Sequence, residues 1–144
     1  LWLVQRAISQ STDSDGPGHR TWLDRHVRRE EIRLKWAKFF DDYDAIIMPV
    51  CFVPPFEHQQ GGDFTSRTLT CNGQIRNYVD VVKWTTMVGM AYLPATVPPT
   101  GLGPSGLPIG CQVVGAYGSD KLTISLAGRV GELMGDYQPP PLAQ

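Results

Sequence analysis

The chain has 144 residues, of which 42% are hydrophobic and 19% are charged, a composition typical of a soluble globular domain rather than a disordered or fibrous protein. A chain of this length can bury about 68–70% of the surface that it exposes when unfolded, so it can form a real core. Its formal net charge of −1 provides no overall attraction for nucleic acid or for anionic lipid.

The N-terminal segment carries no membrane or export signal. No apolar run reaches the roughly 18 residues needed to cross a bilayer, and the patch Leu1–Val4 is too short for a signal-peptide core. Residues 9–18 are polar and rich in glycine, serine and aspartate, which predicts a flexible loop. Because the sequence begins at Leu1 rather than at methionine, we expect further residues upstream.

A long helix is predicted after this loop, with Thr21 as its N-cap. Apolar side chains repeat there at the four-three-four spacing of one helical face. These side chains are Ile32, Trp36, Phe39, Phe40 and Tyr43. Basic and acidic residues almost cancel between positions 22 and 43, so they indicate a solvated face of the helix rather than an anion-binding surface.

The next segments predict a strand and a hairpin. The apolar run Asp44–Met48, ended by Pro49, is typical of a strand buried on both faces. A helix followed by a buried strand favours the α/β class. Asn72-Gly73 predicts a tight turn between strands at Thr68–Cys71 and Gln74–Arg76, within a long aperiodic region.

The C-terminal half is predicted to hold two helices around a strand pair. The first helix has its apolar stripe at Tyr78, Val81, Val82, Thr85 and Val88, and it ends near Gly89. The strands are Ala95–Val97 and Ile109–Val114, joined by the turn-rich stretch Pro98–Pro108.

The last helix is expected to begin at Ser119 or Asp120 and to end at Gly135. We predict that its buried face consists of Leu122, Leu126, Val130 and Leu133. Glycines at 128 and 131 each destabilise a helix by about 1 kcal/mol relative to alanine, which indicates close packing against a neighbour. The tail, residues 137–144, contains three consecutive prolines and should be extended.

The sequence predicts no metal site and no cofactor. The three cysteines, Cys51, Cys71 and Cys111, lack C-x-x-C spacing, so a reducing cytoplasm suits them, and the histidines fall outside zinc-ligand spacings. Gly101–Gly106 matches G-x-G-x-x-G, but Leu107-Pro108 then leads into a strand-like run. A dinucleotide site needs a helix at that point, so we do not expect one.

No catalytic residue is expected in this chain. It contains no G-x-S-x-G elbow and no Ser-x-x-Lys pair. Ser105 is interpreted as a turn serine, and Lys83 as a surface lysine whose stem lies over Trp84. Asp44 and Asp80 have no paired carboxylate at a useful spacing, so neither is given an acid–base role.

One combination of motifs is specific. Gly89-Met-Ala-Tyr-Leu-Pro-Ala-Thr-Val-Pro98 is followed, after a turn, by Gly106-Leu-Pro-Ile-Gly-Cys-Gln-Val-Val-Gly115. This combination resembles the C-terminal part of amidase-signature enzymes, and the resemblance extends over about 120 residues, from Thr21 to Pro141. The proline and glycine positions also suit extended backbone and tight turns, and Gln112 needs a polar partner on its apolar strand.

The resemblance implies an α/β fold in which residues 1–144 form one incomplete domain, the C-terminal part of a larger mixed β-sheet flanked by helices. It implies hydrolysis of carboxylic amide C–N bonds by a Ser-Ser-Lys mechanism with backbone amides as the oxyanion hole. These groups lie upstream of the matched segment, and no Gly-Gly-Ser-Ser-Gly-Gly stretch occurs here. We therefore predict that this chain alone is inactive.

By position, the resemblance implies that five residues border the acyl pocket: Cys51, Phe52, Trp84, Thr85 and Val88. The alternative is that Trp84 and Val88 are ordinary core residues.

The expected partners are a small-molecule amide, bound by the complete enzyme, and the missing N-terminal portion of the same domain, with a homodimer possible. Neither nucleic acid nor a membrane is expected. Two other functions stay open: a noncatalytic amidase-like remnant or interaction module, and an amidotransferase A-type subunit.

Overall fold

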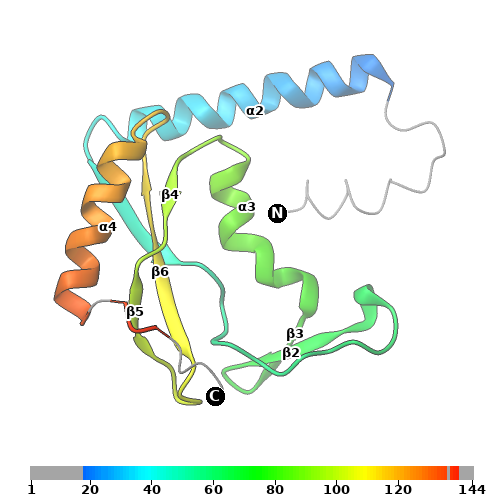
Figure 1. Cartoon of the computed structure of the whole chain (residues 1–144). Coiled ribbons are helices and arrows are strands. Elements are labelled where there is room, and N and C mark those ends of the chain that lie inside the picture. The colour runs from blue at the N-terminus through cyan, green and yellow to red at the C-terminus, as the bar shows by residue number, and fades with distance from the viewer. Residues whose placement is uncertain (1–17, 136, 140–144) are drawn as a thin grey trace.

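The computed structural model describes residues 18–135 and 137–139 (Figure 1). Apart from Gly18, the predicted loop at 9–18 lies outside the described residues. So does the predicted tail beyond residue 139, and residues 137–139 form neither helix nor strand. The helices are α2 (His19–Phe39), η1 (Phe64–Ser66), η2 (Tyr78–Val82), α3 (Lys83–Gly89) and α4 (Asp120–Met134).

The main sheet is built around β6 (Pro108–Gly115). On one side β6 pairs with β1 (Ala45–Pro49), and on the other with β4 (Ala95–Thr96) and β5 (Pro99–Leu102), all antiparallel. The strand β5 was not predicted, because its proline and glycine suggested only a turn. It extends the ladder of β4 past an irregularity at residues 99–101, since a bulge lets such a sequence remain paired.

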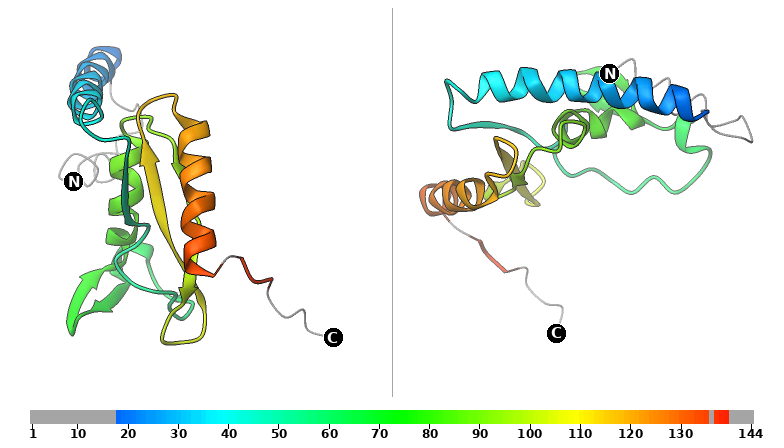
Figure 2. Two further views of the ribbon diagram at one scale, coloured as in Figure 1. Left: turned by 90° about the vertical axis from the view of Figure 1, so that its left-hand side faces the viewer. Right: turned by 90° about the horizontal axis from the view of Figure 1, so that it is seen from above.

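Helices cover both faces of this sheet, as the sequence predicted. Figure 2 shows β6 between α3 and α4, with α2 crossing above one end. On the α3 side, Met48, Val88 and Val114 form a buried cluster. The side chains that pack against this cluster are Trp36, Phe40, Ile46, Trp84 and Leu93.

The strand β1 is buried on one face only, which corrects the prediction. Ile46 and Met48 point into the core, whereas Ile47 is 59% exposed. Ile47 pairs with the fully buried Val113. Because α4 lies over β4, β5 and β6, it covers Val113 and leaves Ile47 open.

The helix α2 begins at His19, two residues before the predicted cap. Gly18 is its N-cap and provides no side-chain hydrogen bond. No residue of α2 is fully buried. Of the predicted apolar face, Trp36 and Phe40 reach the core, while the exposed Tyr43 stacks on Phe39 with ring centroids 4.8 Å apart.

The buried face of α4 is also not the predicted one. Thr123, Ala127 and Gly131 are buried, whereas Leu133 is 84% exposed. Small side chains allow α4 to lie close to the sheet, and the hydroxyls of Thr96 and Thr123 are 3.0 Å apart. The other glycine singled out, at position 128, is exposed, and a Cβ added there would have no neighbouring atom within 4 Å, so its predicted close packing is wrong. Gly135 ends the helix as predicted, with φ 103°.

The predicted hairpin is confirmed. Strands β2 (Thr68–Cys71) and β3 (Gln74–Asn77) pair antiparallel. Asn72 and Gly73 have φ values of 50° and 74°, which suits a two-residue hairpin turn. The helical stripe that begins at Tyr78 is present as well, but it is divided into η2 and α3.

Candidate functional site

Two residues of the second motif, Gly110 and Gln112, have structural roles on β6. Gln112 is 2% exposed, and its Nε2 donates a 2.9 Å hydrogen bond to the carbonyl oxygen of Pro49. A Cβ at Gly110 would lie 2.8 Å from the carbonyl oxygen of Pro98, so no side chain fits there without movement. The predicted partner for Gln112 is present, and Gly110 lies where two backbone segments approach closely.

The G-x-G-x-x-G match is a hairpin turn between β5 and β6. Gly103 N–H donates to Leu107 O at 2.8 Å, and Gly106, with φ 75°, donates to Gly103 O at 2.9 Å. A strand rather than a helix follows this turn, as the sequence predicted. No helix N-terminus therefore follows the glycines to receive a pyrophosphate.

The five residues assigned to the acyl pocket fall into two groups. Val88 is 4% exposed and belongs to the buried cluster with Met48 and Val114, against which Trp84 packs. Thr85 is exposed, and its hydroxyl donates to Val82 O at 3.1 Å.

The other group lies on the loop after β1. Cys51 and Phe52 are both partly buried. The thiol of Cys71 donates to Phe52 O at 3.4 Å, which ties this loop to β2. The two groups thus adjoin β1, one packed on its core face and the other following its C-terminal end.

A hollow of about 380 Å³ lies elsewhere, between α2, the turn after α3 and the turn after β6. It is lined by Glu30, Arg33, Leu34, Ala37, Phe40, Asp41, Ala91, Leu93, Ala116 and Tyr117. None of the five predicted pocket residues is among them. Sequence reasoning missed the hollow because three segments distant in the chain form its walls.

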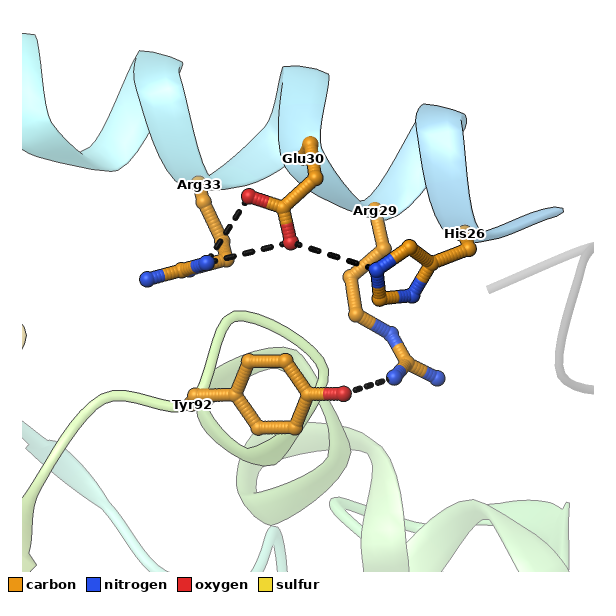
Figure 3. Close-up of polar contacts among 5 residues, drawn as sticks. All are labelled: His26, Arg29, Glu30, Arg33 and Tyr92. Carbon is orange, nitrogen blue, oxygen red and sulfur yellow. Dashed lines mark hydrogen bonds and ion pairs between the residues drawn. The ribbon is translucent and has the colours of Figure 1, made fainter. Parts of the chain in front are cut away.

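The same turn after α3 contacts α2 through charged and aromatic groups (Figure 3). Arg29 donates a hydrogen bond to the Tyr92 hydroxyl, and its guanidinium carbon lies 4.9 Å from the centre of that ring. The guanidinium of Arg33 lies 5.6 Å from the Tyr92 ring and 4.4 Å from the Tyr117 ring. We call Arg29, Arg33 and Tyr92 the Arg–Tyr clamp.

Glu30 holds one member of the clamp in place. Arg33 Nη1 donates to both carboxylate oxygens of Glu30, at 3.0 and 2.8 Å. His26 Nε2 lies 4.0 Å from the same carboxylate. The sequence suggested a solvated charged face here, and this is wrong for Arg29 and Arg33, which lie against aromatic rings.

Tyr92 has a left-handed backbone, with φ 56°. The Leu93 N–H bonds to Val88 O at 3.3 Å and the Tyr92 N–H to Gly89 O at 3.1 Å. These two bonds define a Schellman motif with Tyr92 at the position where glycine is usual. A left-handed conformation costs a residue with a Cβ about 1–2 kcal/mol. One exposed cation–π contact contributes about 0.5–1 kcal/mol, so the two to Tyr92 are of the same size as this strain.

Lys83 forms an ion pair with Asp80, the Nζ and Oδ1 atoms being 2.8 Å apart, so the pairing of Asp80 was missed. In the part of the chain that the structure describes, no group of three or more His, Cys, Asp or Glu residues is arranged to hold a metal ion. No described helix is long and apolar enough to span a membrane.

Comparison with protein families gives a match over most of the chain. The model of the family described as "Amidase" matches residues 3–124. The A subunit of the glutamyl-tRNA(Gln) amidotransferase of Chlamydia abortus is 36% identical over 93 residues, which cover 65% of this chain and 17% of that protein. Its counterpart in Chlamydia trachomatis serovar D is 40% identical over 82 residues, covering 57% of this chain and 14% of that protein.

Solved structures show the same fold. The structure described as "Crystal structure of amidase" superposes with a TM-score of 0.67 at 23% identity, covering 83% of this chain and 26% of that one. An inhibitor-bound structure, from work on a vestigial protein complex and the origins of an s-triazine catabolic enzyme, gives a TM-score of 0.64 at 25% identity and covers 25% of that chain. This chain therefore spans about a quarter or less of the length of the proteins that it matches.

Proposed function

Because this chain belongs to the amidase family, we propose that it is the C-terminal portion of a cytoplasmic amidase that hydrolyses carboxylic amide C–N bonds. The family match over residues 3–124 carries the proposal. It is supported by the motif residues, which adopt the turns and close approaches that the family resemblance requires, at Gly106 and Gly110 above all. The serine nucleophile, the second serine and the lysine base would come from the segment upstream of this chain.

In this proposal the chain contributes shape rather than chemistry. Cys51 and Phe52 would form one wall of the acyl pocket, and Trp84, Thr85 and Val88 the other. The position of both groups beside β1 supports this assignment. Val88 and Trp84 also pack in the core, so they would hold α3 in place. The exposed Thr85 would face the pocket.

The preceding portion of the domain would also cover apolar surface that this chain leaves open. Ile47 on β1 is 59% exposed although its neighbours on the strand are packed. The outer edge of β1 has no partner strand among the described residues. A further strand would pair with this edge, and elements packed beside α4 on the same face would cover Ile47.

The proposal is tested by expressing the complete reading frame and residues 1–144 separately and assaying both with a chromogenic anilide. We expect hydrolysis by the complete protein only, abolished when either upstream catalytic serine is replaced by alanine. Residues 1–144 should match a heat-killed control. Hydrolysis by this shorter chain well above that control would refute the assignment of the catalytic groups to the upstream segment.

A second candidate is an amidotransferase A-type subunit, which the two chlamydial relatives favour by their identity and their name. In that case the complete protein would co-purify with other subunits and would transfer ammonia from glutamine within the complex. Affinity purification from the native cell, followed by a glutamine-dependent transamidation assay, separates the two candidates. A complete protein that purifies alone and hydrolyses anilides would exclude the second.

A further inference from the structure

We propose that Tyr92 is a positioning residue: the Arg–Tyr clamp fixes the C-terminal end of α3 to α2 and so sets the place of the pocket wall that α3 provides. This inference deepens the proposed function and rests on it for its catalytic consequence. Its structural part, the fixing of α2 to α3, stands independently.

The first observation is that tyrosine occupies a backbone position that favours glycine. Tyr92 is the C′ residue of a complete Schellman motif, and its φ is 56°. Glycine would adopt this conformation without strain. A tyrosine at such a position indicates that its side chain is needed there.

The second observation is what the Tyr92 side chain does. Its ring is faced by the guanidinium groups of Arg29 and Arg33, and its hydroxyl accepts a hydrogen bond from Arg29. Figure 3 shows the ring beneath α2, with the Arg29 side chain reaching down to the hydroxyl. Two arginines about one helical turn apart therefore contact the same ring.

The third observation concerns where α2 meets the core cluster of the described residues. None of its residues is fully buried, and only Trp36, at its C-terminal end, packs against the core cluster together with Phe40 beyond it. Arg33 and Arg29 lie about one and two turns, respectively, nearer the N-terminus. The clamp thus adds attachment points along the helix, where the apolar contact with the core cluster is absent.

The clamp and the proposed pocket wall share one short segment. Val88 accepts the hydrogen bond that closes the Schellman motif, and it is also the buried residue of the proposed wall. Trp84 lies one turn earlier on α3. A change in the corner at Tyr92 would therefore move the wall and alter the substrate affinity more than the chemical step.

The experiment uses the complete protein with three substitutions. Tyr92→Gly removes the ring and relieves the backbone, Tyr92→Phe keeps the ring, and Asn72→Gly is the matched control. Asn72 is the other described non-glycine residue with positive φ, at 50°, and it lies in the β2–β3 turn away from the clamp. The measurements are amide hydrogen exchange across residues 19–33 and the values of kcat and KM for a chromogenic anilide.

For Tyr92→Gly we expect exchange across α2 to rise about tenfold. We also expect KM to rise severalfold with kcat retained. In Tyr92→Phe, exchange across α2 and KM should stay close to those of the unmodified protein. Asn72→Gly should change neither. If Tyr92→Gly leaves exchange in α2 unchanged, like the control, the clamp does not hold the helix and the inference is wrong.

The two proposals fail differently. If the unmodified complete protein hydrolyses no amide, the proposed function is refuted, while the exchange measurement still decides whether the clamp holds α2. If the protein is active and exchange in α2 rises but KM is unchanged, the clamp is structural only and the positioning role is overturned.

Discussion

The side-chain amide of Gln112 donates to the carbonyl oxygen of Pro49, a residue 63 positions earlier in the chain, at 2.9 Å. Gln112 lies on β6 opposite Met48, so this bond joins the two strands through a side chain just where β1 ends. Gln112 is buried, and an unpaired polar group there would be costly, whereas Pro49 is exposed at the end of β1.

Replacing Gln112 by leucine should destabilise the protein by about 0.5–1.5 kcal/mol, because the hydrogen bond between β6 and the end of β1 is lost. Urea unfolding followed by circular dichroism measures the change. Gln74→Leu, at an exposed position of β3, is the control and should have little effect. Equal unfolding midpoints for the two variants would show that the bond adds no stability.

Two glycine substitutions should act with opposite signs. Gly110→Ala places a Cβ 2.8 Å from Pro98 O and 3.1 Å from Val97 Cγ1, so we expect a destabilisation of about 1–3 kcal/mol. Gly128→Ala, in the exposed interior of α4 with no atom within 4 Å, should stabilise by up to about 1 kcal/mol. Thermal unfolding of both variants tests the pair, and a stabilised Gly110→Ala would contradict the close approach.

Ile47→Ser distinguishes the separate chain from the complete protein. In residues 1–144 alone the side chain is 59% exposed, and its loss should change stability little. In the complete protein we expect a loss of about 1–2 kcal/mol if the preceding portion covers it. Ile75→Ser, at a position that is 76% exposed on the hairpin, serves as control. The same small effect of Ile47→Ser in both contexts would argue against cover of this face by the preceding portion.

Lys83→Met tests whether this lysine takes part in the chemistry. Its partner is Asp80, 2.8 Å away at a spacing of three residues, and such pairs contribute only about 0.3–0.5 kcal/mol. We expect kcat of the complete protein to be retained. Loss of a general base would lower kcat by about 10²-fold or more, and a loss of that size would make Lys83 a candidate base again.

The sequence predicted those elements that are determined by neighbouring residues in the chain. The Asn72-Gly73 turn was predicted in full because two residues that tolerate positive φ determine the hairpin. The same holds for the end of α4 at Gly135. Residues 99–102 were not predicted as a strand, because Pro99 and Gly101 disfavour one and only the distant strand β6 provides the pairing.

Contacts between distant segments could not be predicted. The bond between Arg29 and Tyr92 joins residues 63 positions apart, and neither residue type indicates the other. The buried face of α4 was misassigned because leucine is the more apolar choice. The sheet instead accepts Thr123, Ala127 and Gly131, whose small size permits close approach. The proposed pocket residues came from family resemblance alone.

Because α2 packs against the core cluster near its C-terminal end, a small tilt there would displace its N-terminal end by a larger distance. Trp36, which packs against the core cluster, lies about 25 Å from His19 at the rise of an α-helix. A tilt of about 10° about Trp36 would move His19 by about 4 Å over that length. Arg29 and Arg33, placed between the two ends, oppose this tilt with greater leverage than the aromatic contacts at the pivot.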